Sequence, residues 1–105
     1  MLVHGVTAPN AVLRVLPALP EDLWWVSAEA AWSATAAVVA AYAPETGRAP
    51  SGSAPRTPED ALDEAVHNRD EHAIKFVDTA LDVYQWTGSD QALAAARVAC
   101  EAIVD

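Results

Sequence analysis

Basic residues are scarce in this chain of 105 residues, which has six Lys and Arg against fifteen Asp and Glu and a formal net charge of -9. Proteins that bind nucleic acid neutralise its phosphates with clustered Lys and Arg, whereas the six basic residues here are dispersed along the chain. Binding to an anionic membrane surface requires similar basic clusters. We therefore expect neither nucleic acid nor a membrane as a partner.

Cysteine and long apolar runs are also lacking. The single cysteine, Cys100, excludes an internal disulfide and fits a reducing cytoplasm. Its alanine-rich setting favours a small buried apolar side chain over the alternative of a reactive thiol. No uninterrupted apolar run approaches the roughly 20 residues of a membrane-spanning helix, and no charged segment precedes an apolar stretch at the amino terminus, as a signal peptide requires. These absences predict a soluble, cytoplasmic protein.

Large apolar side chains are few, although the apolar fraction reaches 52%. Much of that fraction is alanine, which buries little area per residue. A stable core is therefore expected to depend on the scattered aliphatic residues and on seven aromatic side chains acting as anchors. The seven are Trp24, Trp25, Trp32, Tyr42, Phe76, Tyr84 and Trp86.

The first half of the chain shows helical punctuation. Thr7 is a candidate N-cap of a first helix. Ser27 is a candidate N-cap of a second helix, which ends before Pro44. That second segment is apolar all round, as is usual for a helix enclosed by other elements, and the rest of the chain is too small to enclose it. The predicted elements are an extended lead-in over 1–5, a helix from Thr7 to the prolines at 17 and 20, a single turn over 21–25 and a helix over 28–43.

The second half begins after a flexible linker rich in Pro, Gly and Ser at residues 44–56, which divides the chain into helical halves 1–43 and 57–105. A capping threonine, a proline and two acids begin a helix at Thr57. Asp70 is a candidate cap after a break at 68–70, with one continuous helix as the alternative. Gly88 then ends a helix, and a last helix follows Ser89. The pattern predicts an all-α fold, a small bundle of about five helices.

The helix after Asp70 carries two apolar strips. The main strip is formed by Ile74, Val77, Leu81 and Tyr84 at spacings of three, four and three. His72 lies in the other strip, on nearly the opposite side, with Phe76, Thr79 and Val83. A solvated helix face does not normally carry such residues. Another segment is therefore expected to cover this strip, unless it lines a pocket.

The single lysine, Lys75, lies three residues after His72, so that the two side chains share one surface of a helix. Lys75 is either an ion-pair partner of Glu71 at i,i+4 or a functional group. His72 is either a hydrogen-bonded buried histidine or a ligand. His67 fits a solvated helix end. His4, in the apolar lead-in, is either a structural histidine or a ligand. Three histidines without close spacing are a weak metal signal.

Two sequence blocks carry a resemblance. The segments HGVTAP at 4–9 and DEHAIK at 70–75, with Leu-Pro-Ala-Leu-Pro at 16–20, resemble the carboxy-terminal part of questin-oxidase-like proteins. That family is mostly helical, and its members are longer than this chain. Its characterised representatives are oxygen-dependent oxidoreductases that open the ring of anthraquinone-type polyketides. Some members resemble non-haem iron enzymes in which histidines and a carboxylated lysine bind the metal.

The resemblance implies a metal site made by His4 and His72 as imidazole ligands and by Lys75 as its carbamate. Iron(II) accepts such nitrogen and oxygen donors together, and a carbamate turns the lysine into an anionic ligand. The implied cofactors are non-haem iron and, as a candidate electron donor, NADPH. Three ligands do not complete the usual coordination, because the family's other histidines precede the matched region.

The sequence thus favours the carboxy-terminal segment of a questin-oxidase-like oxidoreductase, a fragment of a larger helical enzyme that is inactive alone. Its expected partners are the missing amino-terminal part of that enzyme or a second copy, and the substrate of the complete enzyme would be a small aromatic molecule. The alternative is a small acidic helical module that binds another protein and has no catalytic role.

Overall fold

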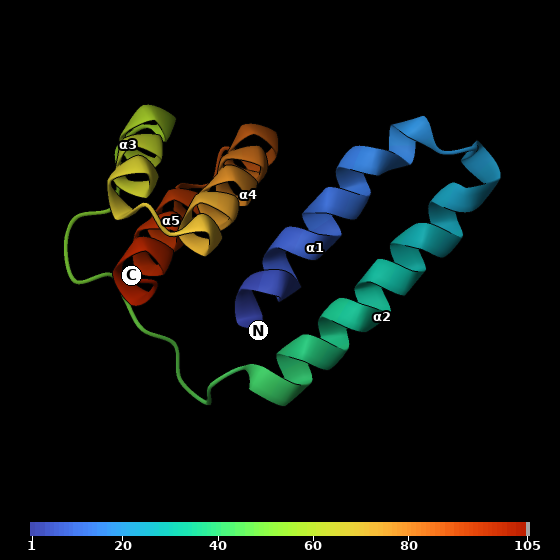
Figure 1. The fold of residues 1–105 in the computed structure, drawn as a ribbon, viewed down its shortest axis with the longest axis horizontal. Coiled ribbons are helices and arrows are strands. Elements are labelled where there is room, and N and C mark those ends of the chain that lie inside the picture. Colours follow the sequence, from blue (N-terminus) through green and yellow to red (C-terminus); the bar gives the residue numbers. More distant parts are fainter. Residues whose placement is uncertain (105) are drawn as a thin grey trace. The chain divides into compact units, whose positions relative to one another are not determined.

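The computed structural model describes residues 1–104, which form five α-helices and two short 3-10 turns and, within that range, no strand (Figure 1). This confirms the all-α prediction. The chain divides into two compact units, Met1–Glu45 and Thr46–Asp105. The elements in chain order are α1 (Leu2–Val15), the turns η1 (Leu16–Ala18) and η2 (Glu21–Leu23), α2 (Trp24–Tyr42), α3 (Pro58–Asn68), α4 (Glu71–Thr87) and α5 (Asp90–Ala102).

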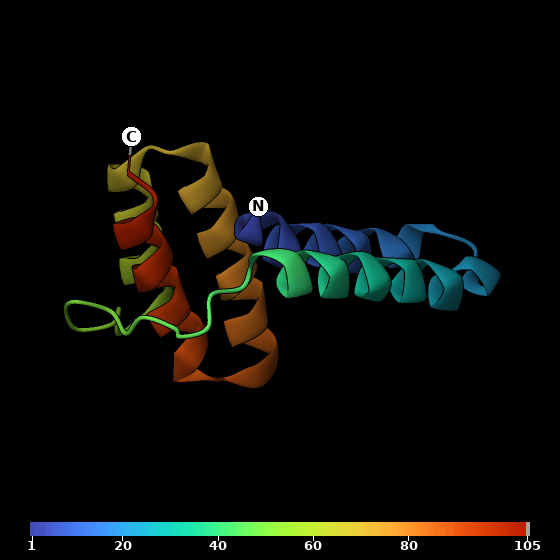
Figure 2. The ribbon, with the colours of Figure 1, turned by 90° about the horizontal axis from the view of Figure 1, so that it is seen from below.

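The amino-terminal unit is a hairpin of α1 and α2, which run antiparallel side by side (Figures 1 and 2). The predicted extended lead-in is wrong, since α1 already begins at Leu2 and continues through Pro9. Its first turns pack on α2: a β-carbon added at Gly5 would lie 3.4 Å from Cγ1 of Val38. Such packing stabilises a helix beyond what its capping residues provide.

The second helix of the hairpin begins earlier than predicted. The turn expected at 21–25 leads directly into α2, which starts at Trp24, so Ser27 lies inside the helix rather than at its cap. The indole Nε1–H of Trp24 donates a hydrogen bond of 3.0 Å to the carbonyl of Leu19. This bond links the loop to the first residue of α2 and favours the earlier start.

Small residues fill the contact between the two helices. The half-buried positions along α2 are Ser27, Ala31, Thr35 and Val38, at spacings of four, four and three, and no residue of this fully described helix is buried. Small side chains let two helices approach closely and leave no room for indole rings between them. Trp24, Trp25 and Trp32 are consequently exposed. The prediction that aromatic side chains anchor the core is wrong for these three and also for Tyr42 and Trp86, which are exposed as well.

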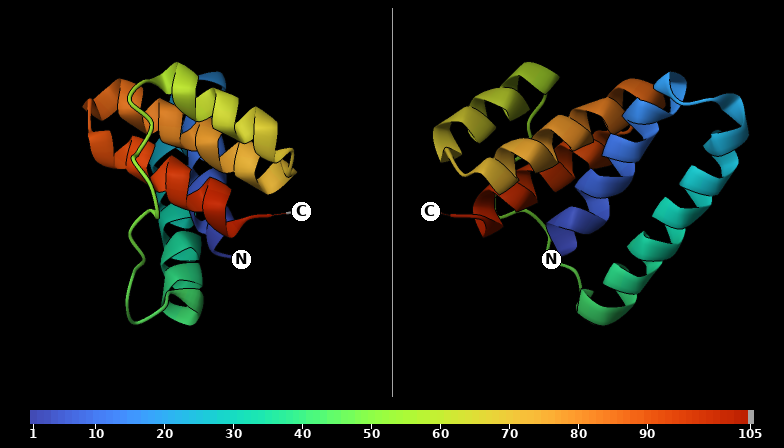
Figure 3. Two further views of the ribbon diagram at one scale, coloured as in Figure 1. Left: turned by 90° about the vertical axis from the view of Figure 1, so that its left-hand side faces the viewer. Right: turned by 45° about the vertical axis from the view of Figure 1, so that its right-hand side comes forward.

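The carboxy-terminal unit packs α3, α4 and α5 around one core (Figure 3). Leu93 and Val77 are its largest fully buried side chains. Alanine supplies most of the remaining contact, again because close helix packing favours small side chains. The buried cluster consists of Ala61, Ala65, Val77, Ala80, Leu93 and Ala96, with Phe76, Leu81, Tyr84 and Cys100 packed against it.

The buried face of α4 is rotated from the predicted main strip. Ala73, Val77 and Ala80 are buried, whereas Ile74 is 41% exposed. The strip was placed by the size of its side chains, but in an alanine-rich core the small residues take the centre of the contact. Phe76, predicted on the opposite strip, packs against the core instead.

The helix boundaries of this unit agree with the capping residues. Thr57 Oγ1 accepts a hydrogen bond of 3.1 Å from the Asp60 amide, and Asp60 Oδ2 accepts one of 3.2 Å from the Thr57 amide, which is a capping box. Asp70 caps α4, and Ser89 caps α5. The predicted break at 68–70 is confirmed, and the alternative of one continuous helix is wrong.

Two residues with left-handed backbone end α3 and α4, and they predict opposite mutational effects. Gly88 has φ of 65°, and Arg69 has φ of 67°. An added β-carbon at Gly88 would meet no atom within 4 Å, so Gly88→Ala is expected to lower stability by about 1 kcal/mol through backbone strain alone. Arg69→Gly should raise stability by a similar amount. Urea denaturation measures both; a change of the same sign in the two variants would contradict this account.

Candidate functional site

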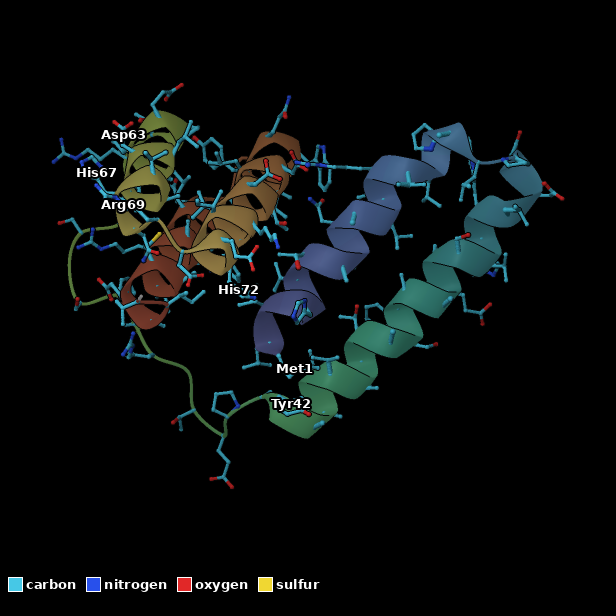
Figure 4. The ribbon with its side chains drawn as sticks, in the orientation of Figure 1. Met1, Tyr42, Asp63, His67, Arg69 and His72 are labelled. Carbon is cyan, nitrogen blue, oxygen red and sulfur yellow. The ribbon has the colours of Figure 1, made fainter. Side chains whose placement is uncertain are left out.

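The DEHAIK block lies at the start of α4, where Asp70 fixes the geometry. The amide of His72 donates a hydrogen bond of 2.7 Å to Asp70 Oδ1, and Nδ1 of the same histidine lies 3.2 Å from that oxygen. The amide hydrogen bond is the main cause that lowers the pKa of Asp70 below its ordinary value. His72 is thus a hydrogen-bonded histidine whose side chain is 44% exposed, at the position labelled in Figure 4.

Lys75 forms an ion pair with Glu71, one helical turn before it. Its Nζ lies 3.0 Å from Glu71 Oε2, and both side chains are exposed, which confirms the predicted ion pair at i,i+4. The hydrogen bond from Lys75, followed by its positive charge, lowers the pKa of Glu71. Carbamate formation requires a neutral amine, so Lys75 would have to leave Glu71 before it could become a metal ligand.

His4, the third proposed ligand, lies on α1 in the amino-terminal unit, whereas His72 and Lys75 share α4 in the other unit. His4 borders a shallow apolar groove between α1 and α2, beside Ala8 and Ala34. Within residues 1–104, no group of three or more His, Cys, Asp or Glu side chains is placed to hold a metal ion. The ligand set that includes a lysine carbamate stays a prediction.

The remaining histidine behaves as its sequence position indicates. His67 is exposed in the last turn of α3, and its Nδ1 lies 2.8 Å from the carbonyl oxygen of Asp63 (Figure 4). This confirms the solvated helix end.

The apolar strip predicted around His72 is divided in the structure. Phe76 packs against the alanine-rich core, while Val83 and Trp86 are exposed. Phe76 lies at the edge of the strip nearest Ala73 and Ala80, so the rotation of the buried face brings it to the core. The strip therefore does not line one continuous apolar pocket around His72.

An ionic cluster in the carboxy-terminal unit escaped the sequence analysis. Arg97 Nη1 lies 2.6 Å from Glu64 Oε1, and Arg97 Nε lies 2.9 Å from Glu101 Oε1. The hydroxyl of Ser51 donates to Glu101 at 2.7 Å, and the Ser51 amide donates at 3.1 Å. These contacts attach part of residues 44–56 to α5. The i,i+4 spacing of Arg97 and Glu101 could have predicted their ion pair. No sequence pattern predicts the contact of Arg97 with Glu64, which lies 33 residues away.

The pKa shifts of the cluster follow from its hydrogen bonds and charges. The hydrogen bonds from Ser51, and then the bond and charge of Arg97, lower the pKa of Glu101. The bonds to Glu101 and Glu64 raise the pKa of Arg97. Burial raises the pKa of the nearby Cys100 thiol, which favours the unreactive thiol and agrees with the predicted apolar role.

The lowered pKa of Glu101 predicts a pH-dependent loss of stability. Because the carboxylate is bound in the folded state, its stabilisation is complete above the ordinary value of 4.5 and disappears as the pH falls through the lower folded pKa. Glu101→Gln should therefore reduce the urea midpoint near neutral pH and have a smaller effect at about pH 3. Glu59→Gln, on the exposed start of α3, is the control. An equal deficit for Glu101→Gln at both pH values would refute the linkage.

The amino-terminal hairpin presents an apolar surface, here called the tryptophan face. Leu13 of α1 and Trp32 of α2 line the same groove, which places them on one side of the hairpin. By helical spacing, two further apolar residues of each helix lie on this side, which makes six in all. All six side chains are exposed. The tryptophan face consists of Leu2, Val6 and Leu13 from α1 and Trp25, Trp32 and Val39 from α2.

Charge is almost absent from the helices that carry this face. Among Asp, Glu, Lys and Arg, the 19 residues of α2 include Glu29 alone, and α1 includes Arg14 alone. No helix of the described residues is long and apolar enough to cross a membrane. The tryptophan face combines six exposed apolar side chains with helices that carry little charge.

Comparisons of the chain with known protein families, with curated proteins and with solved structures gave no match. The resemblance to questin-oxidase-like proteins therefore depends on the segments at 4–9, 16–20 and 70–75 alone.

Proposed function

We propose that this chain is a helical association module, in which the amino-terminal hairpin docks through its tryptophan face onto another protein surface. The observation that carries the proposal is the exposure of Trp25 and Trp32, at 80% and 75%, on a helix without a buried residue. Single exposed apolar residues are ordinary on a soluble protein, but six on one side of a hairpin, two of them indoles, are typical of an interface.

The energetic argument follows from the size of the indole ring. A tryptophan buries about 150–250 Å² in a core or an interface, which corresponds to about 4–6 kcal/mol per ring before the entropic cost of association. Trp25 and Trp32 together therefore supply enough apolar area to dominate a docking energy. Residues of this kind are the usual hot spots of protein interfaces.

Binding of 8-anilinonaphthalene-1-sulfonate to the dilute full chain tests whether the face is open. We expect enhanced dye fluorescence, reduced by more than half in the Trp25→Ser/Trp32→Ser double variant. Trp86→Ser, which removes an exposed indole from α4, is the matched control and should change the signal little. A chain that does not bind dye, or equal binding by the double variant, would overturn the proposal.

A second candidate function is the oxidoreductase segment, supported by the two sequence blocks and by the placement of His72 and Lys75 one turn apart on α4. In that proposal His4, His72 and the Lys75 carbamate would hold non-haem iron, dioxygen would be the oxidant of an aromatic substrate, and a nicotinamide donor would supply the further electrons that reduce dioxygen to water. Iron(II) added anaerobically under carbon dioxide to the chain together with the amino-terminal part of such an enzyme should remain bound through gel filtration and be lost in His72→Ala but not in His67→Ala. Equal iron content in both variants would end this assignment.

A further inference from the structure

We propose that the partner of the tryptophan face is a second copy of this chain, and that two hairpins pack face to face as a four-helix bundle. This inference rests on the proposed docking function and names its partner. Antiparallel helix pairs that each carry one apolar face commonly associate in this way. Three features of the hairpin favour a copy of itself over a different protein.

The first feature is the spacing of the exposed residues on α2. Trp25, Trp32 and Val39 follow one another at intervals of seven residues and extend over about 21 Å of helix. A seven-residue repeat keeps side chains on the seam between helices that cross at about 20°, which is the geometry of most four-helix bundles. The face thus fits another long helix pair better than it fits a globular surface.

The second feature is that the tryptophan face contains both a projection and a hollow. The Trp32 ring projects beside a groove whose α2 side is formed by the small residues Ala28, Ala31 and Thr35. In a two-fold interface, residue i of one copy meets residue j of the other, and the reverse contact is made as well. A ring from each copy can therefore enter the groove of the other, so that one surface supplies both halves of the fit.

The third feature is the distribution of charge. A net charge of -9 opposes the approach of two copies, but eleven of the fifteen acidic residues lie at residues 57–105, outside the hairpin. Glu29 is the single acid of α2, and α1 has none. The face therefore lacks both the repulsion that would separate two copies and the charges that would select a strongly charged partner.

The size of the face sets the expected affinity. Two helices of 14 and 19 residues have lengths of about 21 and 28 Å and, at a diameter of about 10 Å each, present on the order of 500 Å² in projection. Stable complexes bury about 800 Å² per partner, so this interface belongs near the lower limit of the range. We expect a dissociation constant in the micromolar range and a reversible dimer.

Sedimentation velocity of the full chain, from about 1 to about 200 μM, tests this inference. The expected result is a monomer at the low end and a dimer at the high end, with a blue shift of tryptophan emission over the same range. Trp32→Ser should weaken dimerisation at least about tenfold. Trp86→Ser should leave it unchanged, and circular dichroism verifies that each variant stays helical.

The outcomes separate this inference from the docking function. A monomer at every concentration that still binds dye through Trp25 and Trp32 overturns the second copy as partner and leaves the docking function standing. A monomer that binds no dye overturns both. A dimer that Trp32→Ser and Trp25→Ser leave unaffected overturns the assignment to this face. Blue-shifted emission that does not change on dilution identifies packing within one chain and overturns the inference as well.

Discussion

Leu93→Ala is expected to lower the free energy of unfolding of the carboxy-terminal unit by about 2–5 kcal/mol. Leu93 is 1% exposed in α5, and the other buried members of its cluster are four alanines and Val77, whose short side chains cannot extend into the space it leaves. The loss therefore includes both the burial of the isobutyl group and the cavity. For a unit of this size the whole stability is about 3–9 kcal/mol, so the variant should be largely unfolded at moderate urea concentrations.

Urea denaturation followed by circular dichroism measures this effect. Leu62→Ala, which removes the same group from an exposed position of α3, is the control and should change stability by less than about 1 kcal/mol. Similar losses in the two variants would show that Leu93 does not occupy the centre of the core.

Ala65→Leu should destabilise the same unit by about 1–3 kcal/mol, although leucine is an excellent helix former. Ala65 is 1% exposed and belongs to the core cluster, where α3 packs against α4 and α5. Three additional carbons at this position must push the helices apart or force neighbouring side chains from their preferred rotamers.

The same substitution at Ala102, which is exposed at the end of α5, is the matched control and should be nearly neutral. Thermal unfolding distinguishes the two variants. A gain in stability for Ala65→Leu would mean that the core has an unfilled space beside α3 and that close alanine contacts do not set the distance between the helices.

Local chemistry explains which parts of the fold the sequence could predict. Thr57, Asp70, Gly88 and Ser89 act through hydrogen bonds or backbone angles within a few residues, and the boundaries they indicate were correct. The start of α1 was missed because contact with α2 stabilises its first turns, and the start of α2 was missed because no capping residue indicates the Trp24–Leu19 hydrogen bond. Contacts between helices join residues far apart in the chain, like Gly5 and Val38.

The buried faces were harder to predict for the same reason. Side-chain size favoured Ile74 and the tryptophans as core residues, but close packing of helices selects alanine. At the candidate site, the spacing of Glu71 and Lys75 predicted their ion pair, since both lie on one helix. The salt bridge of Arg97 with Glu64 joins two helices, and only the three-dimensional structure reveals it.

The attachment of Ser51 to Glu101 changes where the chain can be divided. A fragment that begins at Thr57 would keep the capping box and the Arg97–Glu101 ion pair but lose both Ser51 donors to the Glu101 carboxylate, as well as the buried Pro55. A fragment that begins at Thr46 keeps them. A fusion protein that carries the carboxy-terminal unit should therefore include the segment before α3, and the suitable boundary for such a fusion lies near Glu45.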